Sequence, residues 1–452
     1  MTATDRDCLK QWDHAYLWHP FTQMREWLAQ DPVVIERAEG NYLFDTDGRK
    51  YFDGVSSLWC NVHGHGRPEL VEAIRKQLDA VAHTTMLGLG NVPAIVLAKR
   101  LIELAPRSLT RVFYSDSGAT AVEIALKMAF EYWQLKGDRD RTLYVSLSDS
   151  YHGDTVGSMS VGYSETLHSR YRPLLFPCLK ISPPHVFRYY RGESDGDALA
   201  HALEEAERTL GENRGRVAAM IVEPLMQGAA GMWNQPAEYA LGLQRLCREN
   251  NILFIADEVA VGFGRTGKMF ACEHAGIMPD LMCLGKGISG GLLPLAATLA
   301  TGEIFNAFLG DYEERKTFFH GHTYTGNPLG CAAGNASLDV FANDDTLARL
   351  QTKIARLSEL LASVQKLGHV SDVRQWGMMI GIELAADAAS RKAYPAAKQM
   401  GKQVILEARK HGLMIRPLGD VVVLMPPLST TLQEMEWLVG VTGECIRAVT
   451  EG

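Results

Sequence analysis

The sequence of 452 residues lacks several features that would assign it to a specialised class of protein. No stretch approaches the roughly 20 consecutive apolar residues of a membrane-spanning helix. The first ten residues, MTATDRDCLK, contain no apolar run behind a basic start. There is no block of lysine and arginine, and the formal net charge is −8. We therefore expect no export signal, no membrane association and no nucleic-acid partner.

Disulfide bonds are not expected either. The eight cysteines lie far apart, without a C-x-x-C pair, in a chain too long to need covalent cross-links. This pattern predicts reduced thiols, most of them buried as small apolar residues, and a cytoplasmic protein.

The length and composition predict a globular protein with more than one domain. Apolar residues make up 46% of the chain, an ordinary fraction for a globular protein. A single hydrophobic core seldom organises 452 residues. We expect an irregular, aromatic-rich N-terminal segment at 1–70, a large domain at 71–335 and a smaller C-terminal domain at 336–452. The N-terminal segment should pack with the small domain.

Short apolar runs alternate with segments of helical periodicity between residues 71 and 335. The runs that we predict as buried strands are Arg111–Ser115, Leu143–Ser146, Val217–Val222, Ile252–Ala256 and Leu281–Leu284. Such alternation predicts an α/β fold whose mostly parallel sheet is covered by helices on both faces.

The two ends of the chain have a different pattern. Asp47-Gly48 is a strong turn pair between two apolar runs, which predicts a hairpin. After residue 336 the sequence predicts a smaller α+β domain. Its expected helices are Leu347–Gln365 and Ala396–His411, and its expected strands are Met378–Leu384 and Val421–Met425.

A turn of small residues at 115–120 follows the first predicted strand and precedes an amphipathic helix. A helix N-terminus exposes N–H groups and the positive end of the helix dipole, which suits a phosphate group. The alternative is an ordinary serine-capped helix, and the turn alone does not distinguish the two.

Each of three further predicted strands is followed by a side chain of a type used in cofactor binding or catalysis. A buried Asp257 needs a cationic partner, and a protonated pyridine nitrogen is one such cation. Lys286, between two glycines, can lose its proton through desolvation and form an imine with an aldehyde. Tyr151 offers an aromatic face for a planar ring. The alternative for Asp257 is a helix-capping aspartate, for Lys286 an exposed lysine in a loop, and for Tyr151 a simple turn.

Together and in order, these segments resemble the class III aminotransferases, which are fold-type-I pyridoxal-phosphate enzymes. The segments that match the central signature of that family are Asp257-Glu258, Gly262–Gly267, Pro279-Asp280 and Gly285–Gly287. The resemblance covers nearly the whole chain. It implies pyridoxal 5′-phosphate as the cofactor, a large domain with a smaller domain formed by the chain ends, and a homodimer with shared active sites.

The resemblance implies a role for each matching residue. Lys286 would hold the cofactor as a Schiff base and move the proton, Asp257 would keep the pyridine nitrogen protonated, and Tyr151 would stack on the ring. The phosphate would be bound by Ser117, Gly118 and Ala119, and by His322 and Thr323 of the partner subunit. The substrate channel, with the N-terminal segment at its entrance, would be lined by Phe21, Leu58, Trp59, Tyr151, Gly321 and Arg416. Arg416 would clamp a carboxylate in a bidentate manner.

Within the family, the segments Trp18–Thr22 and Ile415–Gly419 are similar to the branch that converts 8-amino-7-oxononanoate to 7,8-diaminononanoate in biotin biosynthesis. Members of this branch that use S-adenosylmethionine carry tyrosine at the position of Phe21 and tryptophan at that of Leu58. The missing hydroxyl and indole change how an adenine and a sulfonium are held. Some members of the family that resemble the present pattern take the amino group from lysine. The donor is therefore S-adenosylmethionine or lysine, and these two positions favour lysine.

Three other functions share part of this sequence pattern. A class III transaminase for ω-amino acids or diamines shares the same core motifs. A cofactor-binding protein without activity is disfavoured by the complete set of lysine, aspartate and tyrosine. A nicotinamide dehydrogenase would rest only on the G-x-G-x-x-G match at Gly262–Gly267, after which no long helix is predicted. No metal site is expected, because the histidine pairs His63/His65 and His320/His322 lack a carboxylate ligand set.

Overall fold

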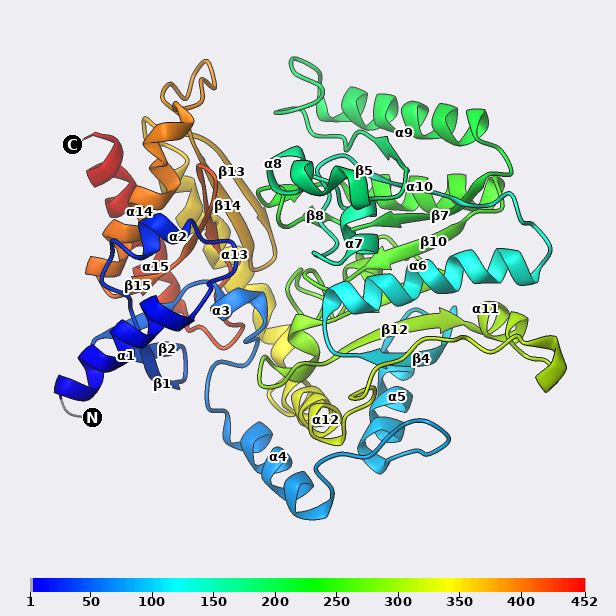
Figure 1. Cartoon of the computed structure of the whole chain (residues 1–452). Coiled ribbons are helices and arrows are strands. Elements are labelled where there is room, and N and C mark those ends of the chain that lie inside the picture. The colour runs from blue at the N-terminus through cyan, green and yellow to red at the C-terminus, as the bar shows by residue number, and fades with distance from the viewer. Residues whose placement is uncertain (1–2, 452) are drawn as a thin grey trace.

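The computed structural model describes residues 3–451, and its largest sheet contains seven strands (Figure 1). Their order across the sheet is β4 (Leu109–Ser115), β12 (Ala296–Thr301), β11 (Leu281–Leu284), β10 (Leu253–Asp257), β7 (Val217–Val222), β5 (Leu143–Leu147) and β6 (Cys178–Ile181). Only β12 runs antiparallel to its neighbours among these described strands. The predicted α/β fold with a mostly parallel sheet is confirmed.

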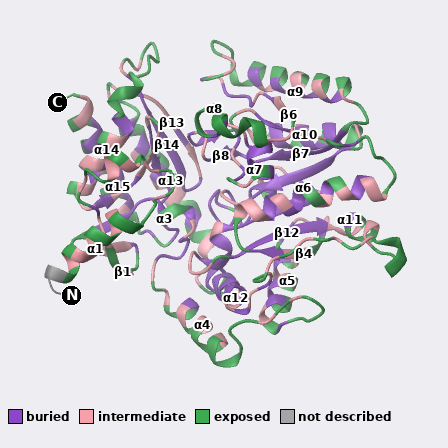
Figure 2. Ribbon diagram, in the orientation of Figure 1, coloured by how far each residue is buried: buried purple, intermediate pink, exposed green. Residues whose placement is uncertain are grey.

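Helices cover both faces of this sheet because its central strands are apolar on both sides. Along β10, Leu253 and Ile255 pack in the cluster that contains helix α6 (Gly118–Leu135). Phe254 and Ala256 point to the opposite face, where α10 (Ala237–Glu249) lies. Figure 2 shows the central strands buried between the two helical layers. The arrangement leaves the strand ends as the place for polar side chains.

A second, four-stranded antiparallel sheet forms the core of the other lobe. Its order is β13 (Val370–Trp376), β14 (Met379–Leu384), β17 (Val421–Leu424) and β16 (Arg416–Leu418). The helices of this lobe are α13 (Thr346–Val364), α14 (Met400–Lys410) and α15 (Leu432–Thr450). Between the lobes, α12 (Pro328–Asn343) packs against α4 (Pro68–Ala80) and α5 (Val92–Leu104). Because α12 runs through residue 335, the division of the chain at that position stays a prediction.

The N-terminal segment is joined to the C-terminal lobe by a small sheet. After α1 (Ala3–Tyr16) and the short α2 (Met24–Trp27), strands β1 (Ile35–Glu39), β2 (Tyr42–Asp45) and β3 (Lys50–Asp53) form a meander. Gly48 has a positive φ of 82° in the turn between β2 and β3, as the predicted hairpin requires. The fourth strand, β15 (Leu413–Met414), pairs with β3 from the far end of the chain.

Three elements differ from the sequence predictions. Strands β6 and β12 were not predicted: β6 has four residues, and β12 consists largely of alanine and threonine. The single helix expected at Ala396–His411 is a 3₁₀ turn at Ala396–Lys398 followed by α14, because Gln399 takes a left-handed φ of 46° between them. No helix within residues 3–451 is long and apolar enough to cross a membrane.

Candidate active site

The residues singled out in the sequence follow the carboxyl ends of the parallel strands, which meet at one edge of the large sheet. Ser117 follows β4, Tyr151 follows β5, Asp257 ends β10 and Lys286 follows β11. The topology therefore brings a helix start, an aromatic ring, a carboxylate and an amine to the same edge.

Lys286 begins a short 3₁₀ turn directly after β11, in a left-handed conformation with φ of 42°. Its Nζ lies 5.4 Å from the centroid of the Trp59 ring and donates no hydrogen bond to any residue in the described part of the chain. Burial lowers the pKa of this amine, although the nearby carboxylates of Asp257 and Glu223 oppose the shift. Desolvation thus favours the neutral, nucleophilic form.

Asp257 is buried and held from two sides. Its Oδ1 accepts the N–H of Val259 at 3.0 Å, and its Oδ2 lies 2.6 Å from Nδ1 of His152. The buried Nε2 of the same His152 ring has no partner in residues 3–451. Asp257 is consequently a fixed carboxylate whose orientation depends on a histidine to which the sequence analysis gave no role.

The N-terminus of α6 fits a phosphate group. Ser117 caps the helix through its side chain, and the N–H groups of Gly118 and Ala119 have no partner among the described residues. A Cβ on Gly118 would lie 2.4 Å from Cγ1 of Val259, and one on Gly285 would lie 3.3 Å from Cα of Gly118. The absence of both side chains lets the helix start pack closely against Val259 and the strand end before Lys286; we call this helix start, together with the neighbouring Lys286, the cradle.

Tyr151 is fixed through its backbone and its hydroxyl. The backbone N–H donates to Oε1 of Glu223 at 3.1 Å, and the hydroxyl donates to Oδ2 of Asp154 at 2.7 Å. Its ring is nearly parallel to that of His168, with centroids 6.3 Å apart. Burial raises the pKa of the Tyr151 phenol, so the hydroxyl remains a neutral donor at neutral pH.

Glu223 is a site residue that the sequence analysis missed. It follows β7, is buried, and accepts N–H bonds from Tyr151 and Gly228. Burial raises the pKa of Glu223 to about 7, with Asp257 acting in the same direction. The available signal was its position directly after the apolar strand Val217–Val222, the same signal that identified Asp257.

The predicted substrate residues fall into two groups. Trp59 is buried, and its Nε1 has no partner in the described chain. Arg416 is half-buried on β16 without an ion pair to any described residue, and its charge partly opposes the rise that burial causes in the pKa of Tyr151. A cation without a carboxylate partner thus lies near the tyrosine. Phe21 and Leu58, in contrast, are 60% and 49% exposed on this chain.

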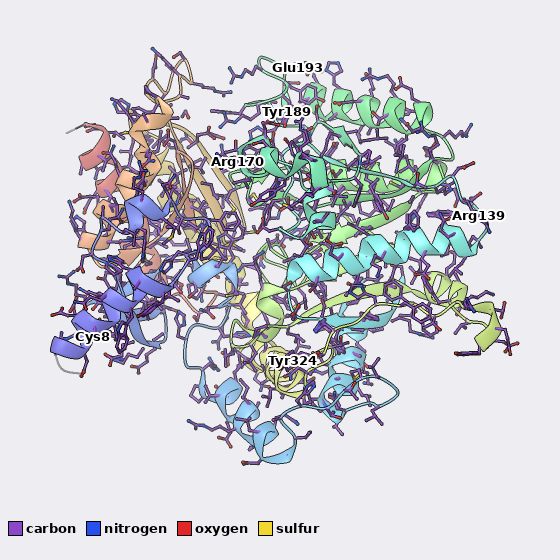
Figure 3. All side chains as sticks on the ribbon, in the orientation of Figure 1. Cys8, Arg139, Arg170, Tyr189, Glu193 and Tyr324 are labelled. Atoms are coloured by element: carbon purple, nitrogen blue, oxygen red, sulfur yellow. The ribbon has the colours of Figure 1, made fainter. Side chains whose placement is uncertain are left out.

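Gly321, His322 and Thr323 are not brought into this group. They lie in the partly exposed loop that precedes α12, where Figure 3 labels Tyr324. The loop is fixed to α6 by Lys127, whose Nζ donates to the carbonyl of Phe319 at 3.3 Å. Within residues 3–451, His322 and Thr323 make no hydrogen bond to the Lys286 group, and Nε2 of His322 is buried without a partner.

The histidine pairs and the glycine motif have other environments. His65 is bonded to Asp53 and His63 to Ser337, and the described residues contain no group of three metal-ligating side chains. Gly262–Gly267 forms turns and is followed only by the short 3₁₀ helix at Ala271–His274. This geometry lacks the long helix that a dinucleotide site requires.

The sequence and the fold are similar to those of known aminotransferases. The family model "Aminotransferase class-III" matches residues 24–446. Two relatives, from Nitratidesulfovibrio vulgaris and Geobacter sulfurreducens, are named adenosylmethionine-8-amino-7-oxononanoate aminotransferase and are 54% and 49% identical to this chain. The matches cover 98% and 100% of this chain and 82% and 100% of the relatives.

Solved structures extend the comparison. The enzyme of the same name from Methanocaldococcus jannaschii has a TM-score of 0.93 at 45% identity, with 98% of this chain and 100% of that chain covered. The omega transaminase from Pseudomonas jessenii in complex with PMP has a TM-score of 0.94 at 30% identity, with 98% of each chain covered.

Proposed function

The chain belongs to the class III aminotransferases, and on this premise we propose that it converts 8-amino-7-oxononanoate to 7,8-diaminononanoate in biotin biosynthesis. It is a pyridoxal-phosphate enzyme. The observation that carries the substrate is the full-length identity of 46–54% to relatives named for this keto acid. Arg416 supports the proposal, because a cation without an ion-pair partner beside Tyr151 suits the carboxylate of that acid.

The cradle described above has the groups needed to hold the cofactor. Ser117, Gly118 and Ala119 offer the helix start to its phosphate, Asp257 offers a carboxylate to its ring nitrogen, and Tyr151 offers an aromatic face. When bound, pyridoxal phosphate supplies an electron-withdrawing ring and an aldehyde that carries the amino group. We assign Lys286 as the residue that holds it covalently.

The chain's own residues control the proton. Desolvation lowers the pKa of the Lys286 amine and so favours the neutral form, whose Nζ accepts a proton from the donor's carbon and returns it. Asp257 is prevented from turning away by Val259 and His152, so its charge stays directed into the site. The buried Trp59 ring, 5.4 Å from the Nζ of Lys286, reduces the access of water to this amine, which strengthens these charge interactions.

The amino donor is S-adenosylmethionine or lysine. The names of the relatives favour the first, whereas Phe21 and Leu58, which provide no hydroxyl and no second indole, favour the second. We propose that these two side chains at the entrance decide between the donors.

A class III transaminase for ω-amino acids or diamines is the second candidate. The TM-score of 0.94 to an omega transaminase favours it, but that protein is only 30% identical to this chain. The fold is common to both activities and does not separate them. The 54% identity to a relative named for the keto acid places the substrate proposal first.

We further propose a homodimer in which each site is completed by Gly321, His322 and Thr323 of the partner subunit. These residues lie next to exposed apolar side chains of the same surface, which a second copy would cover: Leu87, Val92, Ile95, Phe319 and Tyr324. The loop and the segment before α5 are in contact, since Asn91 donates to the carbonyl of Gly326 at 2.9 Å.

We also propose that the chain divides into three parts at residues 70 and 335. The eight free cysteines support the further proposal of a cytoplasmic location.

One assay tests the function and the donor together. Purified enzyme loaded with pyridoxal phosphate is mixed with 8-amino-7-oxononanoate and either S-adenosylmethionine, lysine, putrescine or β-alanine, and 7,8-diaminononanoate is quantified by mass spectrometry. Product with one of the first two donors is expected, and Lys286→Ala should give none, while Lys268→Ala, on an exposed loop, should match the wild type. Removal of the amino group from putrescine or β-alanine, with no amination of the keto acid by any of the four donors, would contradict the proposal.

A further inference from the structure

A polar cavity lies between the segment that precedes α4 and the C-terminal lobe. Its volume is about 240 Å³, below the about 300–1,000 Å³ of drug-sized sites, so a small ligand fits it. Its lining residues are Val62, His63, Arg67, Asp344, Thr346, Arg349, Lys353, Leu428 and Ser429.

The charge of the lining is positive. Arg67, Arg349 and Lys353 contribute three cations against the single lining carboxylate of Asp344. Burial lowers the pKa of His63 to about 4, which keeps this histidine neutral near pH 7. Outside the lining, Glu69 is bonded to Arg67, and Glu434 partly opposes the lowering of the Lys353 pKa by burial. Two positive charges on the lining remain without a carboxylate in the cavity.

The three cations differ in how many hydrogen-bond and ion-pair partners they have. Arg67 is paired with Glu69 at 2.7 Å and with Asp344 at 3.0 Å. Lys353 donates only to the carbonyl of Leu428 at 2.7 Å, and burial together with Arg349 lowers its pKa. Arg349 makes no ion pair or side-chain hydrogen bond with any residue of 3–451. Arg349 is exposed to solvent; a bound anion would give its guanidinium a charged acceptor and would offset its repulsion with Lys353.

The start of helix α13 adds to this potential. The helix has 19 residues, and its first residue, Thr346, lines the cavity. Its N-cap, Asp345, is in the left-handed region with φ of 49° and forms no capping bond through its side chain. The first N–H groups are thus left uncapped at the positive end of the helix dipole, beside Arg349.

We propose that this cavity is a binding site for a small phosphate-bearing anion, separate from the cradle at Gly118. A phosphate offers several oxygens, which matches a fork-shaped guanidinium, an ammonium and a helix start. The site adjoins the catalytic turn through His63: a Cβ on Gly290, the residue that ends the turn Lys286–Ser289, would lie 3.3 Å from Cδ2 of that ring. The proposal goes beyond the transamination and does not depend on its substrate.

The test uses the full chain saturated with pyridoxal phosphate, so that the cradle at Gly118 is already filled. Inorganic phosphate and, in a second arm, pyrophosphate are titrated by calorimetry at constant ionic strength. We expect saturable binding of inorganic phosphate in the millimolar range or tighter and about tenfold weaker binding by Arg349→Gln. The matched variant Arg245→Gln, on the exposed face of α10, should bind as the wild type does. Tighter binding of pyrophosphate would assign the site to a phosphorylated metabolite, and equal or weaker binding to free phosphate.

Hydrogen exchange then locates the anion. Phosphate should slow amide exchange in 344–353 of the wild type and of Arg245→Gln, but not of Arg349→Gln. Absence of saturable binding, equal affinity in both variants, or protection confined to the segment around Gly118 would each overturn the proposal. Because none of these measurements follows turnover, their failure is distinguishable from a failure of the proposed reaction.

Discussion

Lys286 and Arg416 are the two cations of the site, and their surroundings suit them to different tasks. Lys286 is desolvated beside Trp59, so its amine is driven toward the neutral form. Arg416 is a guanidinium in a half-buried position without a carboxylate partner among residues 3–451. A neutral amine serves proton transfer and covalent chemistry, whereas a lasting cation serves the binding of an acid.

Replacing Arg416 should weaken binding of the acid more than it slows the chemistry. We expect Arg416→Gln to raise KM for 8-amino-7-oxononanoate about 10–100-fold with a smaller change in kcat, since a charge-assisted pair contributes about 1.5–3 kcal/mol. Steady-state kinetics measure both constants. A keto substrate of equal length without the carboxylate is the control, and it should be used equally well by both enzymes. An unchanged KM for the acid would remove Arg416 from the substrate site.

Glu258 should make stability fall as the pH rises. Burial raises the pKa of its carboxyl to about 7 in the folded chain, although the N–H groups of Ala271 and Cys272 oppose the shift. An acid with a raised folded pKa stabilises fully below its unfolded pKa near 4.5, and this contribution is lost as pH rises through about 7. The Tm of wild type minus that of Glu258→Gln should therefore be larger at pH 5 than at pH 8. Scanning calorimetry measures this difference in Tm, and the exposed Glu249→Gln is the control variant. Equal differences in Tm at pH 5 and pH 8 would contradict the argument.

The sequence allowed a prediction of Lys286 and Asp257 because each follows an apolar strand within a distinctive motif. It did not indicate His152 or Glu223 as site residues. Their significance depends on burial and on contacts over long separations in the chain, such as the 2.6 Å contact between His152 and Asp257. The catalytic and binding roles of all these residues stay predictions until they are measured.

At the scale of elements, the junction between β4 and α6 depends on one missing side chain. Gly118 lies so close to Val259 that an added Cβ would be 2.4 Å from Cγ1 of that residue. Gly118→Ala must displace Val259, whose N–H holds Asp257, or the helix start itself. We expect the affinity for pyridoxal phosphate to fall by about tenfold or more, and Tm to fall by a few degrees.

Titration of the apoenzyme with pyridoxal phosphate, followed by absorbance, measures the first effect. The matched control is Gly440→Ala in the exposed part of α15, where a Cβ would have no neighbour within 4 Å. That variant should keep its cofactor affinity and gain up to about 1 kcal/mol of stability from helix propensity. If both variants bound the cofactor equally, the close contact at Gly118 would not matter.

Elements with a strong local signal were predictable, and those defined by their neighbours were not. The five predicted strands of the large sheet are short apolar runs between segments of helical periodicity, and each is present. Strand β12 pairs antiparallel between β4 and β11, an order that becomes apparent only in three dimensions. The break at Gln399 likewise depends on a left-handed residue that no glycine or proline announces.

At the scale of the whole molecule, the three predicted parts of the chain meet at Arg265. This fully buried guanidinium donates to the carbonyl of Trp59 in the N-terminal segment and to that of Pro426 in the C-terminal lobe. Burial lowers the pKa of Arg265 to about 10, so the residue keeps its charge near pH 7. One side chain of the large lobe is therefore hydrogen-bonded to both the N-terminal segment and the C-terminal lobe.

The proposed dimer predicts that two inactive chains can restore one another. In a shared site, Lys286 comes from one chain and His322 and Thr323 from the other. A mixed dimer of Lys286→Ala with the double variant His322→Ala/Thr323→Ala then contains one intact site and one site with both defects. Equal mixing with subunit exchange should give about a quarter of the wild-type activity, because half of the dimers are mixed and each has one working site.

The control for this exchange is a mixture of Lys286→Ala with Asp257→Ala. Both residues belong to the same chain's part of the site, as the shared sheet edge shows, so every site in that mixed dimer carries one defect and no activity should return. Recovery in the first mixture alone identifies the loop before α12 as the partner's contribution. Recovery in neither would mean that each chain builds its site by itself, and the exposed apolar surface around Tyr324 would then need another partner.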